Sequence, residues 1–365
     1  MRLDGETVEW LLGGDPAIRW QVERDLQHAP PTQWRATRGR VASEGFGARL
    51  LALQDPEGTW AGGARFPARE DERAHDPAEG LSPMPHIDPL PQPQPWIATT
   101  WSLNDLREWG VPAAALDGTE RKLRLGCRWE YEDRPYWAGE VDCCVNAWTL
   151  ANGTWLGADV RAVERWLLQH QLGDGGWNCE WAKGSLHSSF HSTLNVLSGL
   201  LERELRGADE VEDLHQLRES RHRGEQYLLE RHLLHRRTTG EDVGPFVSAF
   251  AYPFRSQYSA LRAADHFRRA AAADDAVPDE RLSDAIDLIR AKRGSDGRWH
   301  QDFTRPGLVW FDVNGPAGEA SRWLTLYAAR VVAWWDGAGS GDQDPEGAGS
   351  GHQDPDRVGS GEAAP

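Results

Sequence analysis

The chain has few sulfur-containing residues and no long apolar run. Its 365 residues include only two Met and four Cys, at positions 127, 143, 144 and 179. So few cysteines in so long a chain do not suggest a disulfide scaffold, and a reduced environment is expected. The mean hydropathy is −0.64, and no segment offers the roughly 20 apolar residues of a membrane-spanning helix. The sequence therefore predicts no transmembrane segment.

Basic residues are also scarce relative to acidic ones. There are 40 Lys and Arg against 57 Asp and Glu, which gives a formal net charge of −17 at pH 7. Duplex DNA or an anionic membrane surface would repel such a chain, so we expect no nucleic-acid partner. The first residues, "MRLDGETVEWLLGGDPAIRW", lack the basic region and apolar core of a signal peptide. This absence favours a cytoplasmic protein.

Tryptophan, in contrast, is abundant, with 19 residues. Each Trp buries a large apolar area, so this number indicates a large interior. Core packing accounts for most of these side chains. The alternative is that several of them line a cavity, where aromatic rings bind apolar or cationic ligands.

Two segments do not have the pattern of a folded domain. Residues 337–365 are rich in Gly, Ser, Asp and Pro and have no apolar periodicity, so we expect a disordered acidic tail. A Pro-rich insertion near residues 68–95 excludes regular helix, because proline removes a backbone donor. The rest of residues 1–336 is expected to form one domain.

Apolar residues in that domain recur with the spacing of helices, whereas strict alternation is rare. One kind of predicted helix has a charged face: Trp34–Leu53, Thr119–Cys127, Asp159–Gln171, Val211–Leu234 and Asp279–Lys292. The other kind is richer in apolar and small residues: Trp96–Trp109, Cys143–Leu156, Ser188–Leu201, Ser256–Phe267 and Ala320–Trp335. A further helix is predicted near Trp10–Leu26. The two kinds alternate, which is typical of outer helices packed around inner ones.

A short motif repeats where predicted helices end. "LLALQDPEGTW", "LLQHQLGDGGW" and "IRAKRGSDGRW" each have an apolar helix end, a polar residue, a Gly/Asp turn, and a Trp six residues after the polar one. Glycine lets the chain leave the helix in a left-handed conformation, so that the Trp can pack back over the helix end. Three copies of the motif indicate stacked helical units.

The segments Gln54–Trp60 and Gln171–Trp177 resemble the QW motif of the triterpene cyclases of the squalene-hopene cyclase type. Protein prenyltransferase β subunits have the same fold as these cyclases. The resemblance covers most of Met1–Trp335 and implies an all-α (α/α)6 toroid. In such a toroid the inner helices are parallel and begin on one rim. We therefore expect Asp142, Cys144, Cys179 and His191 to converge there.

The first interpretation of this rim is a zinc site. The resemblance to prenyltransferases implies zinc ligands at an Asp-x-Cys and at a His that begins the next inner helix, here Asp142, Cys144 and His191. Three ligands leave an open, catalytic position, and Cys179 as a fourth would close the site. The Arg and Lys with which that family grips a prenyl diphosphate are replaced here by Tyr136 and Gly139.

Two other interpretations remain. In triterpene cyclases the middle Asp of Asp-x-Asp-Asp protonates an alkene, and Asp142 takes that place here, with Glu140 and Cys143 beside it. Alternatively, Asp142 is only a helix N-cap, the adjacent cysteines are small buried hydrophobes, and His191 is a hydrogen-bonded core residue.

The resemblance implies an enzyme of the terpene cyclase or prenyltransferase type, acting on an apolar, isoprenoid-like molecule in an aromatic cavity. Asp142 and His191 are its predicted catalytic residues. The alternative is a non-catalytic toroid that binds a hydrophobic ligand or a partner protein, with at most a structural zinc. Arg255, Arg262 and His266 either bind an anion in the cavity or form pairs within their helix.

Overall fold

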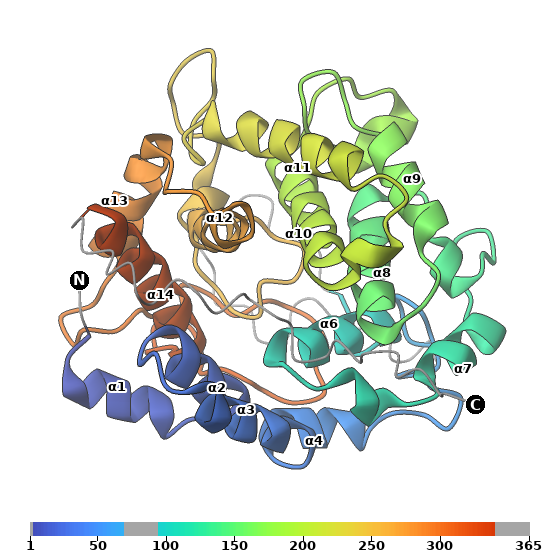
Figure 1. Cartoon of the computed structure of the whole chain (residues 1–365), viewed down its shortest axis with the longest axis horizontal. Coiled ribbons are helices and arrows are strands. Elements are labelled where there is room, and N and C mark those ends of the chain that lie inside the picture. The colour runs from blue at the N-terminus through green and yellow to red at the C-terminus, as the bar shows by residue number, and fades with distance from the viewer. Residues whose placement is uncertain (1–2, 69–93, 340–365) are drawn as a thin grey trace, which may run out of the picture.

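The computed structural model describes residues 3–68 and 94–339. Within these ranges the chain is mostly helical and forms no β-strand, only isolated bridges, which confirms the all-α prediction (Figure 1). The α-helices are, in chain order, α1 (Gly5–Leu12), α2 (Pro16–Asp25), α3 (Pro31–Gly39), α4 (Gly45–Leu51), α6 (Thr99–Trp109), α7 (Thr119–Gly126), α8 (Cys143–Leu156), α9 (Arg161–Gln169), α10 (Phe190–Gly207), α11 (Leu214–Leu229), α12 (Ala260–Asp274), α13 (Ser283–Ala291) and α14 (Arg322–Gly339).

Two predicted helices are each broken in two. The single helix expected over Trp10–Leu26 is wrong, because α1 ends at Leu12 and α2 begins at Pro16. Proline has no N–H to continue a helix but suits the first turn, and the carboxylate of Asp15 caps the new helix through Ala17 N at 2.9 Å. The helix expected over Trp34–Leu53 is likewise divided into α3 and α4 by a 3-10 turn.

The boundaries of α8 agree with the sequence prediction. The helix spans Cys143–Leu156 and ends at Gly157, whose φ of 74° is the left-handed conformation of a helix C-terminus. At the other end of the domain, α14 continues to Gly339, three residues into the predicted tail. Residues 69–93 and 340–365, which hold most of the predicted insertion and tail, lie outside the described residues.

The apolar-rich helices are neighbours of one another. In Figure 1, α7, α9, α11 and α13 lie at the periphery, and α6, α8, α10 and α12 lie closer to the centre. Side-chain hydrogen bonds link these central helices with α2 and α14 in succession. They join Trp20 to Trp109 (α2 to α6), Asn152 to Asn104 (α8 to α6), Asn195 to Cys144 (α10 to α8), Arg262 to Asn195 (α12 to α10), Arg330 to Asp265 (α14 to α12) and Arg330 to Gln21 (α14 to α2).

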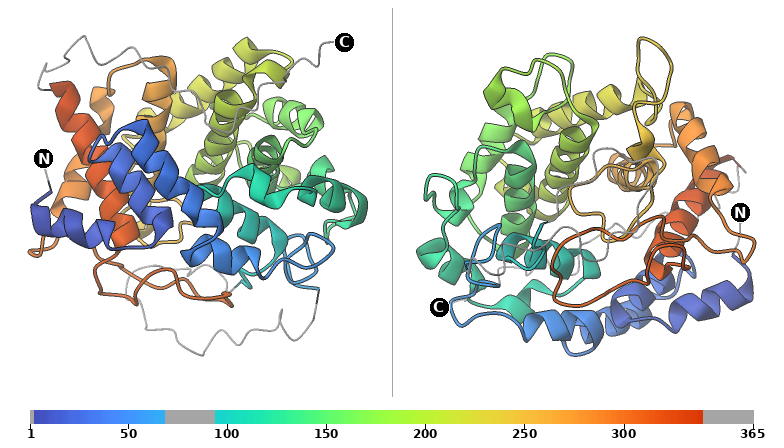
Figure 2. Two further views of the ribbon diagram at one scale, coloured as in Figure 1. Left: turned by 60° about the horizontal axis from the view of Figure 1, so that its bottom comes forward. Right: turned by 180° about the vertical axis from the view of Figure 1, so that it is seen from behind.

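The last of these links brings the C-terminal helix to the N-terminal ones. Figure 2 shows α14 beside α1 and α2. Arg322 donates from Nε to the carbonyl of Trp10 at 3.0 Å, and its guanidinium lies 4.7 Å from the centroid of that indole ring. Segments about 300 residues apart are therefore packed together, and the described chain forms one continuous core.

The three Trp-marked turns have the same hydrogen bonds. Trp60, Trp177 and Trp299 are at most 1% exposed. Each indole N–H donates to a carbonyl ten residues earlier, at the end of the preceding helix: Trp60 to Leu50, Trp177 to Leu167 and Trp299 to Ile289, at 2.9, 2.8 and 2.7 Å. The prediction that each Trp packs back over a helix end is confirmed.

The polar residue and the glycine of the motif also have repeated roles. Two residues before each Trp lies a glycine with positive φ: Gly58 at 87°, Gly175 at 97° and Gly297 at 78°. The carbonyl of that glycine accepts from the side chain of the motif's polar residue, which is Gln54, Gln171 or Arg293. Only glycine takes this backbone conformation at little cost, so the turn depends on it.

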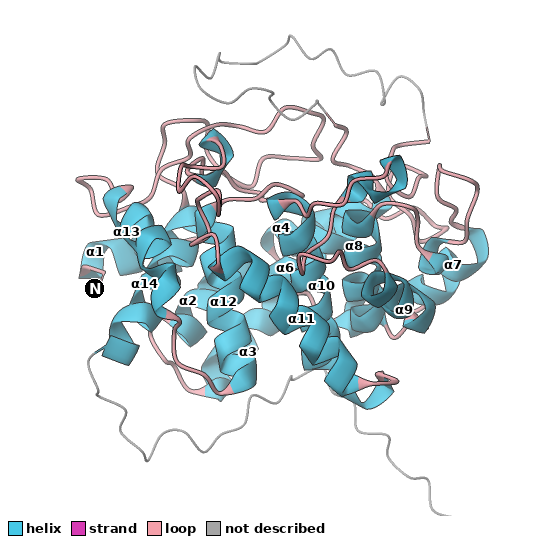
Figure 3. Cartoon of the chain, turned by 90° about the horizontal axis from the view of Figure 1, so that it is seen from above, coloured by secondary structure: helices cyan, strands magenta, loops and turns pink. Residues whose placement is uncertain are grey.

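Most loops lie on one side of the helices (Figure 3). The loops that precede α6, α8, α10, α12 and α14 bond to one another or to the start of the next of these helices. The bonds join Ala64 to Glu130, Trp181 to Val141, Tyr258 to His191, Phe250 to Asp302, and Trp96 to Leu308. The starts of these five helices therefore share one side of the molecule, which we call the loop side.

Candidate metal centre

Three cysteines meet on the loop side. Cys143 and Cys144 are the first two residues of α8, and Cys179 begins a 3-10 turn between α9 and α10. Asn178 caps that turn through Glu180 N, and the backbone N–H of Cys179 donates to Ser192 Oγ of α10 at 3.2 Å. These bonds hold the loop against α10, so that Cys179 reaches the start of α8.

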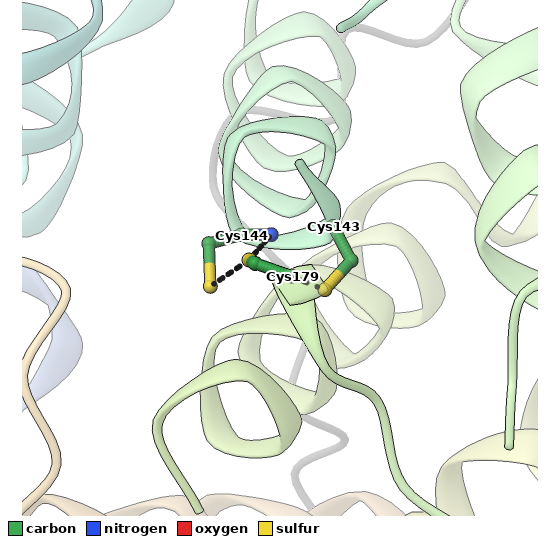
Figure 4. Close-up of side chains that lie close together, drawn as sticks. All are labelled: Cys143, Cys144 and Cys179. Carbon is green, nitrogen blue, oxygen red and sulfur yellow. Dashed lines mark hydrogen bonds between the residues drawn. The ribbon is translucent and has the colours of Figure 1, made fainter. Parts of the chain in front are cut away.

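The three sulfur atoms are in contact. The Sγ of Cys179 lies 3.4 Å from that of Cys143 and 3.2 Å from that of Cys144, and it accepts the backbone N–H of Cys144 at 3.5 Å (Figure 4). All three sulfurs lie within 4.8 Å of one another. They carry no disulfide.

Neighbouring donors favour a thiolate in this cluster. Asn195 Nδ2 donates to Cys144 Sγ at 3.4 Å, and Ser192 Oγ donates to Cys179 Sγ at 3.5 Å. Hydrogen bonds from Cys143 and Cys179 hold the pKa of Cys144 well below its usual range, and the same interactions, with burial, raise that of Cys143. A negative charge on Cys144, at the N-terminus of α8, is therefore stabilised.

The donor set and its spacing fit a soft metal ion. Thiolate sulfur is a preferred ligand of zinc, with Zn–S bonds of about 2.3 Å in a tetrahedron, so ligand sulfurs lie about 3.8 Å apart. The observed contacts of 3.2 and 3.4 Å need to widen by only about half an ångström to meet that geometry. Three sulfurs leave one of the four positions open.

Asp142, a predicted ligand and catalytic residue, contributes no ligand atom to this group. It occupies the N-cap position of α8, but its carboxylate makes no capping hydrogen bond and instead accepts from Arg65 Nη1 at 3.2 Å. Burial raises the pKa of Asp142, as does the nearby Cys179, while Arg65 lowers it. The N-cap interpretation is correct for the backbone position and wrong for the side chain.

His191, the other predicted ligand and catalytic residue, also lies outside the group of sulfurs. It is the second residue of α10, and its Nδ1 accepts the backbone N–H of Tyr258 at 2.9 Å. The proton of the neutral ring is then on Nε2, which becomes a donor and not a metal ligand. Burial lowers the pKa of His191 to about 4, and the charges of Arg262 and Arg305 act in the same direction.

Cys143 was expected only as a small hydrophobe or in the place of an Asp, and not as a ligand. The signal that could have identified it was the adjacent pair of cysteines at a helix start, with a third in the next loop of the same side. Asn195 was also missed, although it follows His191 by one helical turn and faces the same space. Cys144 and Cys179 are brought together as predicted.

No protein-family model matches the chain, and neither does any curated protein. Within the part of the chain that the structure describes, no helix is both long enough and apolar enough to cross a membrane.

A second group of metal-capable side chains is already occupied by cations of the protein. His222, Glu225 and Asp274 lie within 4.8 Å of one another. However, the buried guanidinium of Arg221 donates to Glu225 at 2.9 Å and to Asp274 at 2.5 Å. His266 also contacts Glu225, at 2.9 Å. Arg221 thus takes up both carboxylates, while burial lowers the pKa of His266 and leaves it a neutral hydrogen-bonding partner. The group is an internal network of ion pairs and hydrogen bonds.

A small cavity lies beside the sulfur cluster, with a volume of about 70 Å³. Its lining combines two indole rings, Trp101 and Trp148, with charged and amide side chains, among them Asp105, Arg255, Arg262 and Asn195. Asn195 also bonds to Cys144. The cavity and the cluster therefore share a wall, and that wall is polar.

Proposed function

We propose that this chain is a zinc-dependent enzyme built on an (α/α)6 toroid, with Cys143, Cys144 and Cys179 as the metal ligands. The observation that carries this proposal is the contact of three thiols from two segments, at 3.2 and 3.4 Å. The alternation of inner and outer helices and the succession of hydrogen bonds from α2 back to α2 support the toroid. The repeated Trp turns support the terpene cyclase and prenyltransferase type of fold.

The open fourth position gives the site its chemistry. A metal with three protein ligands can bind a water molecule or a substrate atom, lower its pKa and polarise it. Asn195 and Ser192 orient two of the sulfur ligands, as the hydrogen-bonding groups around a metal site do. Within this proposal Asp142 and His191 act beside the metal: the first as a carboxyl held by Arg65, the second as a neutral Nε2–H donor.

The cavity beside the cluster favours a particular substrate. An isoprenoid or other apolar molecule is the class implied by the resemblance. A cavity of about 70 Å³ can take only one end of such a molecule, against Trp101 and Trp148. The charged lining favours a substrate that carries an ionic group as well as an apolar part, because a hydrocarbon would leave the buried charges unsolvated.

A structural zinc is the second candidate. Asp142 directly precedes Cys143, and its side chain is 31% exposed. A turn of this carboxylate from Arg65 toward the sulfurs would complete four protein ligands and leave no position for substrate.

Elemental analysis of the full-length chain, purified under reducing conditions, tests the metal. We expect one zinc per chain, lost in Cys143→Ala, Cys144→Ala and Cys179→Ala. Cys127→Ala is the matched control, because Cys127 is 4% exposed but lies outside the cluster. Absence of metal from the reduced protein, or equal loss in the control, would contradict the proposal.

Cobalt substitution separates the two candidates. Cobalt bound by thiolates has a sulfur-to-metal charge-transfer band. An open site changes this band and the weaker visible bands when a small thiol or imidazole is added, and Asp142→Asn leaves the metal content unchanged. A closed site shows no such response, and Asp142→Asn loses metal.

A further inference from the structure

Two guanidinium groups on the loop side, the buried Arg305 and the half-buried Arg262, form no salt bridge among the described residues. Arg305 is 9% exposed, donates from Nε to the carbonyl of Pro253 at 2.6 Å, and has a buried Nη1 without any hydrogen-bond partner. Arg262, in the first turn of α12, donates to Gln257 O at 3.0 Å and to Asn195 Oδ1 at 2.8 Å. All of these acceptors are neutral.

Three other buried arginines, Arg203, Arg221 and Arg330, form ion pairs, and Arg38 donates to the carbonyl of Gly110 at 2.9 Å. Arg330 contacts Asp265 at 2.7 Å and Asp25 at 3.3 Å. Arg221 contacts Glu225 at 2.9 Å. Burial of an unpaired charge is costly, and proteins compensate for it with an opposite charge. Arg305 is buried, forms no salt bridge among the described residues and leaves Nη1 without an acceptor, so it indicates a missing anion.

Arg305 and Arg262 donate to two carbonyls of one loop, those of Pro253 and Gln257, and Arg255 lies between these two positions in the chain. Burial lowers the pKa of Arg305 to about 9, and the charges of Arg255 and Arg262 contribute to that shift. Arg255 is neutralised by Asp105, at 2.8 and 2.9 Å. The other carboxylate on this wall, Glu108, accepts from Tyr327 Oη at 2.6 Å. That bond leaves the negative charge of Glu108 in place, and Glu108 and Cys144 both favour the charged form of Arg262. Arg305 is therefore the guanidinium on this wall that has, among the described residues, neither an ion pair nor an acceptor for Nη1.

We propose that Arg262 and Arg305 bind an oxyanion group, a phosphate or a carboxylate, of the molecule that enters this side of the domain. The guanidinium group is well suited to such anions, because its planar array of donors matches two oxygens at once. An oxyanion here would supply the acceptor that Arg305 Nη1 lacks.

The position of this anion site relates it to the sulfur cluster. Asn195 connects the two: its Oδ1 accepts from Arg262, and its Nδ2 donates to Cys144 Sγ. A substrate anchored on Arg262 would thus lie one amide group from a metal ligand. That the anion belongs to a substrate rests on the proposed zinc function. Binding of the anion itself needs no metal.

The test is a thermal-shift titration of the full-length chain with inorganic phosphate and with acetate, at constant ionic strength set by chloride. It is done on the metal-free and on the zinc-loaded protein. We expect a saturable rise of the melting temperature in both forms. A response to phosphate indicates a phosphate-bearing ligand, and a response to acetate alone indicates a carboxylate. The response of the metal-free protein distinguishes failure of this proposal from failure of the zinc proposal.

Arg305→Gln and Arg262→Gln are each expected to lower the affinity for the anion at least tenfold. Arg165→Gln is the control, because Arg165 forms an exposed pair with Glu212. Arg305→Gln removes an unpaired buried charge, so without anion this variant should melt no lower than the wild type, a result that a purely structural role for Arg305 does not give. Equal responses of wild type and both variants, or no response beyond that to chloride, would overturn the proposal.

Discussion

The Trp-marked turns and the loop-side cluster of thiols and arginines are built in opposite ways. In each turn the buried indole N–H has a partner, and the motif's polar side chain bonds to the carbonyl of the glycine. On the loop side, three thiols have one another as their nearest polar contacts, and Arg305 Nη1 has no partner. Buried polar groups whose hydrogen bonds are all made within the protein stabilise the fold. Buried polar groups that lack a partner indicate where a ligand binds.

The largest effect that we expect is loss of a turn. Trp177→Ala removes a fully buried indole from the core and should lower the free energy of unfolding by about 3–5 kcal/mol. Trp177→Phe keeps much of the packing and removes one of the two donors to the Leu167 carbonyl, which still accepts the backbone N–H of His170 at 3.3 Å. This variant should cost about 1 kcal/mol. Denaturant unfolding followed by circular dichroism measures both values.

Trp335→Ala is the control for that experiment, because Trp335 is only partly buried at the end of α14. It should cost about 1 kcal/mol. Equal losses for Trp177→Ala and Trp335→Ala would mean that the turns contribute no more than any other contact of an aromatic ring.

Metal binding should give the next largest effect, and only in the cluster. A ligand that binds the folded state alone stabilises it by about 2.7 kcal/mol at 100 times its dissociation constant. Zinc should therefore raise the melting temperature of the wild type and of Trp177→Phe, and a chelator should reverse the rise. Cys144→Ser should not respond. If the melting temperature of Cys144→Ser rose with zinc as much as that of the wild type, the metal would not be bound by these cysteines.

His191, on the loop side, makes the free energy of unfolding depend on pH. The pKa of its imidazole falls from 6.5 to about 4 on folding, chiefly through burial. Between these values the unfolded chain binds more protons, so the stabilising contribution is complete above pH 6.5 and is lost as the pH falls to about 4. The loss amounts to as much as about 3 kcal/mol.

His191→Asn isolates this contribution, because the amide oxygen can replace Nδ1 as the acceptor for Tyr258 N–H. The difference in unfolding free energy between wild type and variant should change between pH 6.5 and 4. A constant difference over this range would show that His191 already takes up its proton in the folded state at the unperturbed pKa.

How far the sequence predicts each region depends on the range of its contacts. The turn around Trp177 was correctly predicted because its main partner, Leu167, lies ten residues away in the same motif. The ends of α8 were predicted from its local pattern. The break before Pro16 was missed although the proline was visible, because the apolar periodicity continues across it.

The candidate site was only partly predictable, because its decisive partners are distant in sequence. Arg65 takes the carboxylate of Asp142 from 77 positions away, and Tyr258 takes Nδ1 of His191 from 67 positions away. No periodicity records such contacts. The residue types and their positions near helix starts predicted that Cys144 and Cys179 would meet. The contact of Cys143 with Cys179 depends on how the loop packs against α8 and was not predicted.

The smallest effect on stability that we expect comes from Ser192, where the effects on stability and on zinc binding can be separated. Ser192 Oγ accepts the backbone N–H of Cys179 and donates to its sulfur. Ser192→Ala should therefore lower the free energy of unfolding by only about 1 kcal/mol. If Cys179 is a metal ligand as proposed, the hydroxyl orients it, and the same variant should weaken zinc binding about 10- to 100-fold, measured by competition with a chelator. Ser198→Ala, which removes a hydroxyl bonded to the Leu194 carbonyl in the same helix, should cost similar stability and leave zinc affinity unchanged. If both variants weakened zinc equally, the hydroxyl of Ser192 would act through the helix as a whole and not through the sulfur of Cys179.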